Sequence, residues 1–126
     1  MIGNRMRAFA FTAAVALIGL ASPAAASPYD GSWKMVLVTT NGHCGVINIA
    51  MAVDGGHISA TKGRFVMHKI FLDGRIAGGG QTIINGVAGP RQAKGVGRFT
   101  NAKGSGKWNG TGPSGVCSGY WVADRG

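Results

Sequence analysis

The spacing of glycine along this chain constrains its fold more than any other sequence feature. There are 23 glycines among the 126 residues, and from residue 27 onward they divide the chain into short segments of the length that β-strands require. None of these segments keeps the 3.6-residue hydrophobic period of an amphipathic helix. We therefore expect a fold made of short strands joined by tight turns.

The clearest strand covers residues 46–53. The apolar residues at positions 47, 49, 51 and 53 alternate with small or polar ones, which is typical of a strand with one face in the core. Asp54-Gly55-Gly56 follows directly. Because glycine reaches positive φ without steric cost, this sequence predicts a hairpin turn and an antiparallel partner strand over residues 57–61.

The same features recur along the chain. The predicted strands are residues 32–39, 46–53, 57–61, 65–72, 81–87, 92–100, 105–110 and 116–123. Asp73-Gly74 fits either a two-residue turn or the inside of a longer bent strand that ends at residues 78–80, and the three consecutive glycines there favour the second. About eight antiparallel strands without a crossover helix predict an all-β meander, closed as a small barrel. A two-sheet sandwich is the alternative, but closure removes strand edges that would otherwise pair with other molecules.

The first 26 residues have the pattern of a cleavable, helical export signal. Arg5 and Arg7 precede an apolar run over residues 8–20, and three alanines at positions 24–26 fit a cleavage site before Ser27. A membrane anchor is the alternative, but the run is shorter than the ~20 residues needed to span a bilayer, and Pro23 interrupts it. We therefore expect a signal peptide over residues 1–26 and a single β domain over residues 27–126, periplasmic or secreted.

Cys44 and Cys117 are the only cysteines, near opposite ends of the predicted domain. Export would expose them to oxidising conditions, so we expect a disulfide between them, with free thiols or a metal pair as the alternative. A domain of this size buries only somewhat more than ~60% of its unfolded surface. In the chain-entropy model a disulfide closing so long a loop stabilises the fold by roughly 4 kcal/mol.

The charge balance is strongly basic, with 13 lysines and arginines against four aspartates. Two of these arginines would leave with the signal, so eleven would remain and the formal charge would be +7. No acidic residue occurs between Asp73 and Asp124, which predicts a positive potential over that segment. The candidate basic face consists of Arg91, Lys94, Arg98, Lys103 and Lys107. It is either a solvated surface or a site for anionic envelope lipid or polysaccharide; nucleic acid is not the expected partner, because no aromatic-interleaved motif accompanies the charge.

Each of the three tryptophans follows a glycine by two residues: Trp33, Trp108 and Trp121. Residues two apart lie on one strand face, so we expect that the glycine makes room for the indole to lie across the sheet. The structural interpretation is a core corner in which each indole N–H reaches a carbonyl. The functional interpretation is an aromatic platform for a sugar or flat ligand, which fits Trp108 best because Lys107 and Asn109 flank it.

The Gly-x-Trp of the first strand, together with Arg125 just after the last, resembles the signature of the lipocalin and avidin superfamily of ligand-binding barrels. That resemblance implies that a tryptophan and a late cation pack across one end of a barrel. It leads to a candidate aromatic corner of Trp33, Trp108, Trp121 and Arg125.

A second resemblance covers the whole predicted domain. The segments YDGSW (29–33), GRI (74–76), GSGKWNG (104–110) and CSGYWVADR (117–125) are similar to those of a family of small exported proteins of alpha-proteobacteria that share the two cysteines. This resemblance implies export, a disulfide and an all-β fold, and it implies no activity.

Residues suited to catalysis are few. There is no glutamate, and three of the four aspartates directly precede glycine, as is typical of turns. The histidines are His43, His57 and His68; His43 adjoins Cys44, but this adjacency lacks the ligand spacing of a zinc site. We therefore expect no enzyme, no cofactor and no metal site.

These observations favour an exported, non-enzymatic binding protein that associates with anionic envelope material through its basic face. The first alternative is a barrel with an internal apolar ligand site, which a core filled by Phe65, Met67, Phe71 and the three indoles would argue against. The second alternative is an inhibitor of a secreted enzyme, although a basic target such as a lysozyme would be repelled.

Overall fold

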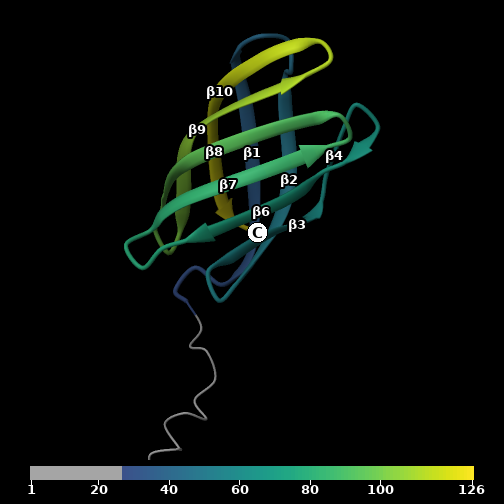
Figure 1. Ribbon diagram of the computed structural model, residues 1–126. Coiled ribbons are helices and arrows are strands. Elements are labelled where there is room, and N and C mark those ends of the chain that lie inside the picture. The colour runs from purple at the N-terminus through teal and green to yellow at the C-terminus, as the bar shows by residue number, and fades with distance from the viewer. Residues whose placement is uncertain (1–26) are drawn as a thin grey trace, which may run out of the picture.

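A computed structural model describes residues 27–126, which form a closed antiparallel β-barrel (Figure 1). The strands are β1 (Gly31–Asn41), β2 (Val46–Asp54), β3 (His57–Lys62), β4 (Arg64–Phe65), β5 (His68–Lys69), β6 (Phe71–Ile76), β7 (Gln81–Ala88), β8 (Arg91–Phe99), β9 (Lys103–Gly112) and β10 (Gly115–Arg125). Eight of them close the barrel in the order β1-β10-β9-β8-β7-β6-β3-β2, and β4 and β5 form a separate hairpin. The predicted signal peptide, residues 1–26, lies outside the described residues.

The prediction of an all-β barrel is confirmed, and the sandwich alternative is wrong because β1 pairs with both β2 and β10. The β2–β3 hairpin is also confirmed: Asp54 pairs with His57 across a two-residue turn in which Gly55 and Gly56 have φ of 60° and 80°. Both values fit the type I′ turn that matches strand twist. Asp73 and Gly74 lie within β6, which is the second of the two alternatives considered for them.

The prediction of one strand over residues 65–72 is wrong. This segment holds the short β4–β5 hairpin and only the start of β6. Its turn consists of Val66 and Met67, which have φ of 48° and 69° although neither is glycine. Positive φ is rare for a β-branched residue and costs of order 1–3 kcal/mol. Sequence reasoning missed the turn because it contains none of the residues that favour turns.

The core is densest at one end of the barrel, where Trp33, Phe99 and Trp121 pack together. The Phe99 ring lies 5.0 Å from the Trp33 ring, edge to face, and 5.5 Å from the Trp121 ring. Edge-to-face and offset contacts of this kind stabilise aromatic clusters. Trp33, Trp121 and Phe99 are each at most 2% exposed.

Glycines of β8 and β9 make the room for this cluster. A Cβ atom at Gly97 would lie 2.6 Å from the Trp121 ring, and one at Gly106 would lie 2.7 Å from its indole nitrogen. Both distances are too short for a side chain. The predicted role of the glycine two residues before each tryptophan is therefore wrong: the side chain closest to Gly106 belongs to Trp121 on the next strand, and not to Trp108.

The start of the described segment, at residue 27, and the C-terminus lie near each other at this aromatic end (Figure 1). Arg125 donates hydrogen bonds to the carbonyls of Pro28, Asp30 and Asn101, and the Tyr29 hydroxyl donates to the Gly78 carbonyl. The segment before β1 therefore crosses this end of the barrel, which we call the closed end.

The predicted disulfide is confirmed. Cys44, in the loop after β1, is bonded to Cys117 of β10, with 73 residues of sequence separation and a Cα–Cα distance of 6.1 Å. The bond lies at the end opposite the aromatic cluster, which we call the open end. It adds a covalent link to the β1–β10 pairing that closes the barrel.

Replacing both cysteines, Cys44→Ala/Cys117→Ala, should lower the free energy of unfolding by about 4 kcal/mol, because the unfolded chain regains the entropy of a long open loop. Urea unfolding measures this change. Wild-type protein treated with a reductant should behave like the variant, and a reductant that leaves the unfolding midpoint of the wild type unchanged would contradict the assignment.

Asp30 joins the segment before β1 to the β2–β3 turn. Its carboxylate accepts hydrogen bonds from the Ser27 hydroxyl and from the backbone N–H groups of Gly55, Gly56 and Ser27. These bonds favour the charged form. The Ser27 hydroxyl, followed by the Gly55 N–H, lowers the pKa of Asp30 from 3.8 to about 2.

Because the pKa of Asp30 is lower in the folded state, its stabilising contribution is complete above about pH 4 and is lost as the pH falls towards 2. The difference in unfolding free energy between wild type and Asp30→Asn should therefore be constant above pH 4 and shrink below it. Denaturant melts from pH 2 to pH 6 measure it. Asp54→Asn, beside the same turn, is the control. If the stability difference between wild type and Asp54→Asn changed with pH in the same way, the role of Asp30 would be contradicted.

Candidate functional site

The two ends of the barrel differ in how their interiors are filled. At the closed end, the guanidinium carbon of Arg125 lies 4.5 Å from the centre of the Trp33 ring, and Trp33 Nε1 donates to the Tyr29 carbonyl over 2.7 Å. This is the packing that the lipocalin and avidin resemblance implies for Trp33 and Arg125. Cation–π contacts of this kind add to the burial of the ring. Arg125 and the segment before β1 therefore cover Trp33, which is 1% exposed, at the closed end.

The open end holds an apolar cavity of about 80 Å³. Its walls include residues of β1, β2, β4 and β6 to β10, and both disulfide cysteines, Cys44 and Cys117, are among them. A second volume of about 30 Å³ adjoins it towards the closed end. The side chains shared by the two volumes are Leu37, Ile49, Leu72, Ala93 and Trp108. The cavity thus extends from the open end to the level of the indoles.

Trp108 lies in the wall of this cavity and apart from the aromatic cluster, so the predicted four-residue corner divides. Trp33, Trp121 and Arg125 belong to the closed end, and Trp108 belongs to the cavity. Its Nε1 donates to the Val38 carbonyl over 3.2 Å, which leaves the ring face to the cavity. The predicted flanking role of Lys107 and Asn109 is wrong, because both lie on the exposed face of β9 while Trp108 is buried.

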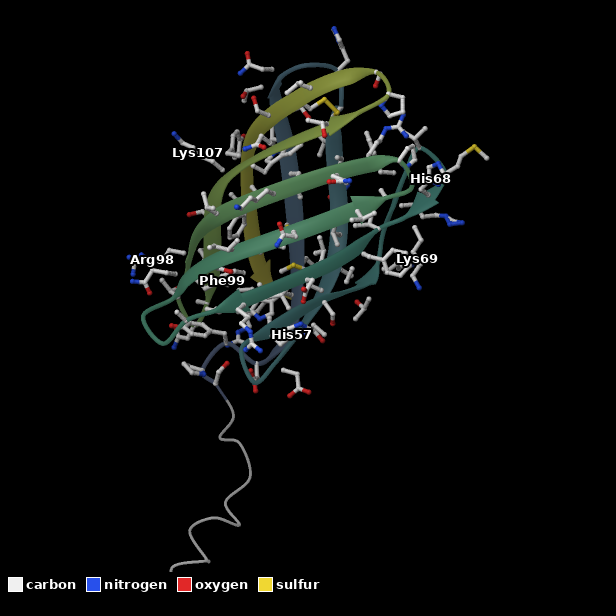
Figure 2. All side chains as sticks on the ribbon, viewed as in Figure 1. His57, His68, Lys69, Arg98, Phe99 and Lys107 are labelled. Atoms are coloured by element: carbon white, nitrogen blue, oxygen red, sulfur yellow. A yellow bond between two sulfur atoms is a disulfide. The ribbon has the colours of Figure 1, made fainter. Side chains whose placement is uncertain are left out.

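The candidate basic face also divides. Lys94, Arg98 and Lys107 lie on the outer face of β8 and β9, as the alternation of β8 predicts, and Figure 2 shows Arg98 and Lys107 pointing away from the barrel. Lys103 makes a 2.8 Å salt bridge with Asp124, and this hydrogen bond raises the pKa of Lys103. Three of the five cations therefore remain on one outer surface.

Arg91 lies elsewhere. It belongs to the inward-facing set of β8, is only half exposed and lines the cavity. Its guanidinium carbon is 5.5 Å from the centre of the ring of Phe65, which precedes the turn of the β4–β5 hairpin. This arrangement puts a permanent positive charge at the edge of an apolar cavity.

Phe65, Met67 and Phe71 do not fill the core. Phe65 is half-buried, whereas Met67 is 88% and Phe71 60% exposed. The filled-core arrangement that would argue against a ligand site is therefore absent from residues 27–126. The interior positions of β7 to β9 near the open end carry small residues instead, among them Gly86, Ala93 and Gly110. That run of small inward residues is the sequence signal for the cavity, but it can be read only once the strand register is known.

One histidine does contact a carboxylate. His57 Nε2 lies 2.7 Å from Asp73 Oδ1, between β3 and β6, and both side chains are exposed. Sequence reasoning placed Asp73 among turn residues and missed the pair. The pair lies on the outside of the barrel and not in the cavity. Within residues 27–126, no three histidine, cysteine or aspartate side chains gather as a metal site would require.

Over the same residues there is no helix with the length and hydrophobicity that crossing a bilayer requires. No protein-family model and no curated protein sequence matches this chain.

Proposed function

We propose that this barrel is a non-enzymatic binding protein that takes the apolar part of a small ligand into its open end. The observation that carries the proposal is the cavity of about 80 Å³ between Trp108, Ile49 and Leu72, whose lining is almost entirely apolar. A concave apolar site with one or two polar groups at its edge is the usual form of a small-molecule site. The signal-like N-terminal sequence and the disulfide support action outside the cytoplasm.

The size of the cavity limits the ligand. Pockets for whole drug-sized molecules measure about 300–1,000 Å³, so this cavity holds one ring or a few methylene groups. Each buried methylene contributes about 0.8 kcal/mol, and a few of them give only millimolar affinity. A second contact is needed for tighter binding.

Arg91 supplies that second contact. Its guanidinium group lies at the cavity edge, and no acidic residue lines either volume. Guanidinium groups bind carboxylate, sulfonate and phosphate oxygens with paired hydrogen bonds. The ligand class that fits is a small amphiphile with an apolar ring or chain and one anionic group.

The fluorescent amphiphile 1-anilinonaphthalene-8-sulfonate tests this proposal. Ala93→Leu places three additional carbons in the cavity and should weaken binding at least tenfold, and Arg91→Gln should weaken it by removing the charge. Ala77→Leu adds the same side chain in the exposed β6–β7 turn at the closed end, so it serves as the matched control. Fluorescence titration of the folded variants measures each dissociation constant.

Wild-type affinity in Ala93→Leu would contradict the proposal, as would equal losses in Ala93→Leu and Ala77→Leu. A melting curve for each variant separates loss of the site from loss of the fold.

A second candidate function is association with anionic polysaccharide through the outer face of β8 and β9. The observation that favours it is the grouping of Lys94, Arg98 and Lys107 around Val96: Lys94 and Arg98 are two residues either side of Val96, and Lys107 pairs with it. No aspartate pairs with these three cations. Their summed potential attracts polyanions in a salt-dependent manner.

Heparin chromatography tests this second function with two variants of equal charge. Lys94→Glu/Lys107→Glu reverses two charges of the outer face, and Lys34→Glu/Lys62→Glu reverses two elsewhere on the barrel. The first variant should elute at clearly lower salt than the second, because local potential and not net charge holds the polymer. Elution of both at the same salt would refute a specific basic face.

A further inference from the structure

The open end carries an exposed apolar surface around the mouth of the cavity, and the two share Val87 and Arg91. Its most exposed side chains are Met67 (88%), Val116 (66%), Phe71 (60%) and Val66 (52%). Contiguous exposed apolar side chains of this size mark surfaces that bind a partner or a membrane. We call this surface, with the cations beside it, the open rim; it comprises Arg64, Val66, Met67, Lys69, Phe71, Val87, Arg91 and Val116.

Strand register places three of the exposed apolar residues in one row around the open end. Phe71 of β6 pairs with Val87 of β7, Val87 pairs with Gln92 of β8, and Gln92 pairs with Thr111 of β9. Thr111 pairs in turn with Val116 of β10. These residues form one row across five strands on the outer face near the open end. Phe71 and Val87 lie at one end of the row and Val116 at the other, with the polar residues Gln92 and Thr111 between them. The β4–β5 hairpin adjoins β6 and lies at the edge of the barrel beside the same row (Figure 1).

The tip of the hairpin presents its apolar side chains in an unfavourable backbone conformation. A type I′ turn of this kind favours Asn-Gly, yet the two positions are Val66 and Met67, both at positive φ. Neither side chain packs in the core, since both are exposed. Packing within the barrel therefore does not explain why valine and methionine occupy this turn. Strained backbone segments of this type are concentrated at binding sites.

Charge at the rim has one sign. Arg64 and Lys69 lie on the β4–β5 hairpin and Arg91 lies at the start of β8. The Lys69 and Arg91 cations are 5.2 Å and 5.5 Å from the ring centres of Phe71 and Phe65. All four aspartates lie elsewhere: Asp54 is beside the β2–β3 turn, to which Asp30 is hydrogen-bonded, Asp73 contacts His57 and Asp124 contacts Lys103. His68 also lies on the hairpin (Figure 2).

We propose that the open rim docks on an anionic bilayer, with Val66, Met67 and Phe71 inserted among the lipid headgroups. In this arrangement the apolar side chains contact the upper part of the acyl chains, and the cations beside them contact the negative headgroups. A protein partner would need a surface whose shape complements the hairpin tip. The side chains of Val66 and Met67 can enter a fluid lipid layer without such a surface. Docking in this orientation turns the mouth of the cavity towards the lipid. The proposal holds whether or not the cavity takes a ligand.

Vesicle sedimentation tests whether the protein docks on lipid. The protein used is the barrel, residues 27–126, because every contact described for the rim lies within these residues. The probes are vesicles of phosphatidylcholine alone and of phosphatidylcholine with an equal part of phosphatidylglycerol, at 0.1 M salt. The wild type should bind the anionic vesicles and only weakly the neutral ones. Arg64→Gln/Lys69→Gln should lower the partition coefficient for anionic vesicles about thirtyfold, since each cation near the surface contributes roughly fivefold.

Val66→Asn/Met67→Gly is the decisive variant. It installs the preferred type I′ sequence, so its melting temperature should equal or exceed that of the wild type while its binding falls at least tenfold. The matched control, Ile83→Thr/Val96→Thr, removes two exposed apolar side chains from the outer face away from the rim and should bind like the wild type.

Three results would overturn the proposal: no binding of the wild type to anionic vesicles, wild-type binding by Val66→Asn/Met67→Gly, or an equal loss in the Ile83→Thr/Val96→Thr control. Binding of Arg64→Gln/Lys69→Gln that matches the wild type would overturn the requirement for an anionic leaflet.

Discussion

The contact between the Trp121 indole and the glycines of β8 and β9 determines how the rest of the barrel is filled. With a side chain at Gly97 or Gly106 the ring could not lie against the sheet. With it in place, Trp121, Trp33 and Phe99 fill one end of the barrel, as side chains fill the interior of small barrels generally. Small inward residues continue towards the other end, where Trp108 and Leu72 lie beside them but leave a cavity unfilled. The same glycine-rich strands therefore give a solid end and an open one.

The two ends are stabilised by different means. Aromatic packing, the hydrogen bonds of Arg125 and the carboxylate of Asp30 hold the closed end together. The open end has little such packing, and there the Cys44–Cys117 bond links the strand pair that closes the barrel. A covalent link keeps a cavity from collapsing without filling it, which a larger core side chain could not do. This division is suited to a protein that must keep an opening in a small fold.

Local patterns predicted the barrel, the β2–β3 hairpin, the disulfide and the exposed positions of Lys94 and Arg98, because each depends on alternation, turn chemistry or cysteine count. They failed where the outcome depends on register between distant strands. The glycine beneath an indole lies on a neighbouring strand, so counting back two residues named the wrong one. The Val66-Met67 turn has no turn-forming residue and was read as strand. An internal apolar site could be given only as an alternative, because its lining depends on register between strands. The open rim was missed because the hairpin turn contains no turn-forming residue.

The most direct test of the unequal filling is a crystal structure of the barrel under xenon pressure. Xenon occupies apolar cavities and needs no polar partner. We expect a xenon atom between Trp108, Ile49 and Leu72, at the open end, and none within the cluster of Trp33, Phe99 and Trp121. A barrel that takes up no xenon, or takes it up among the closed-end aromatic rings, would contradict the account.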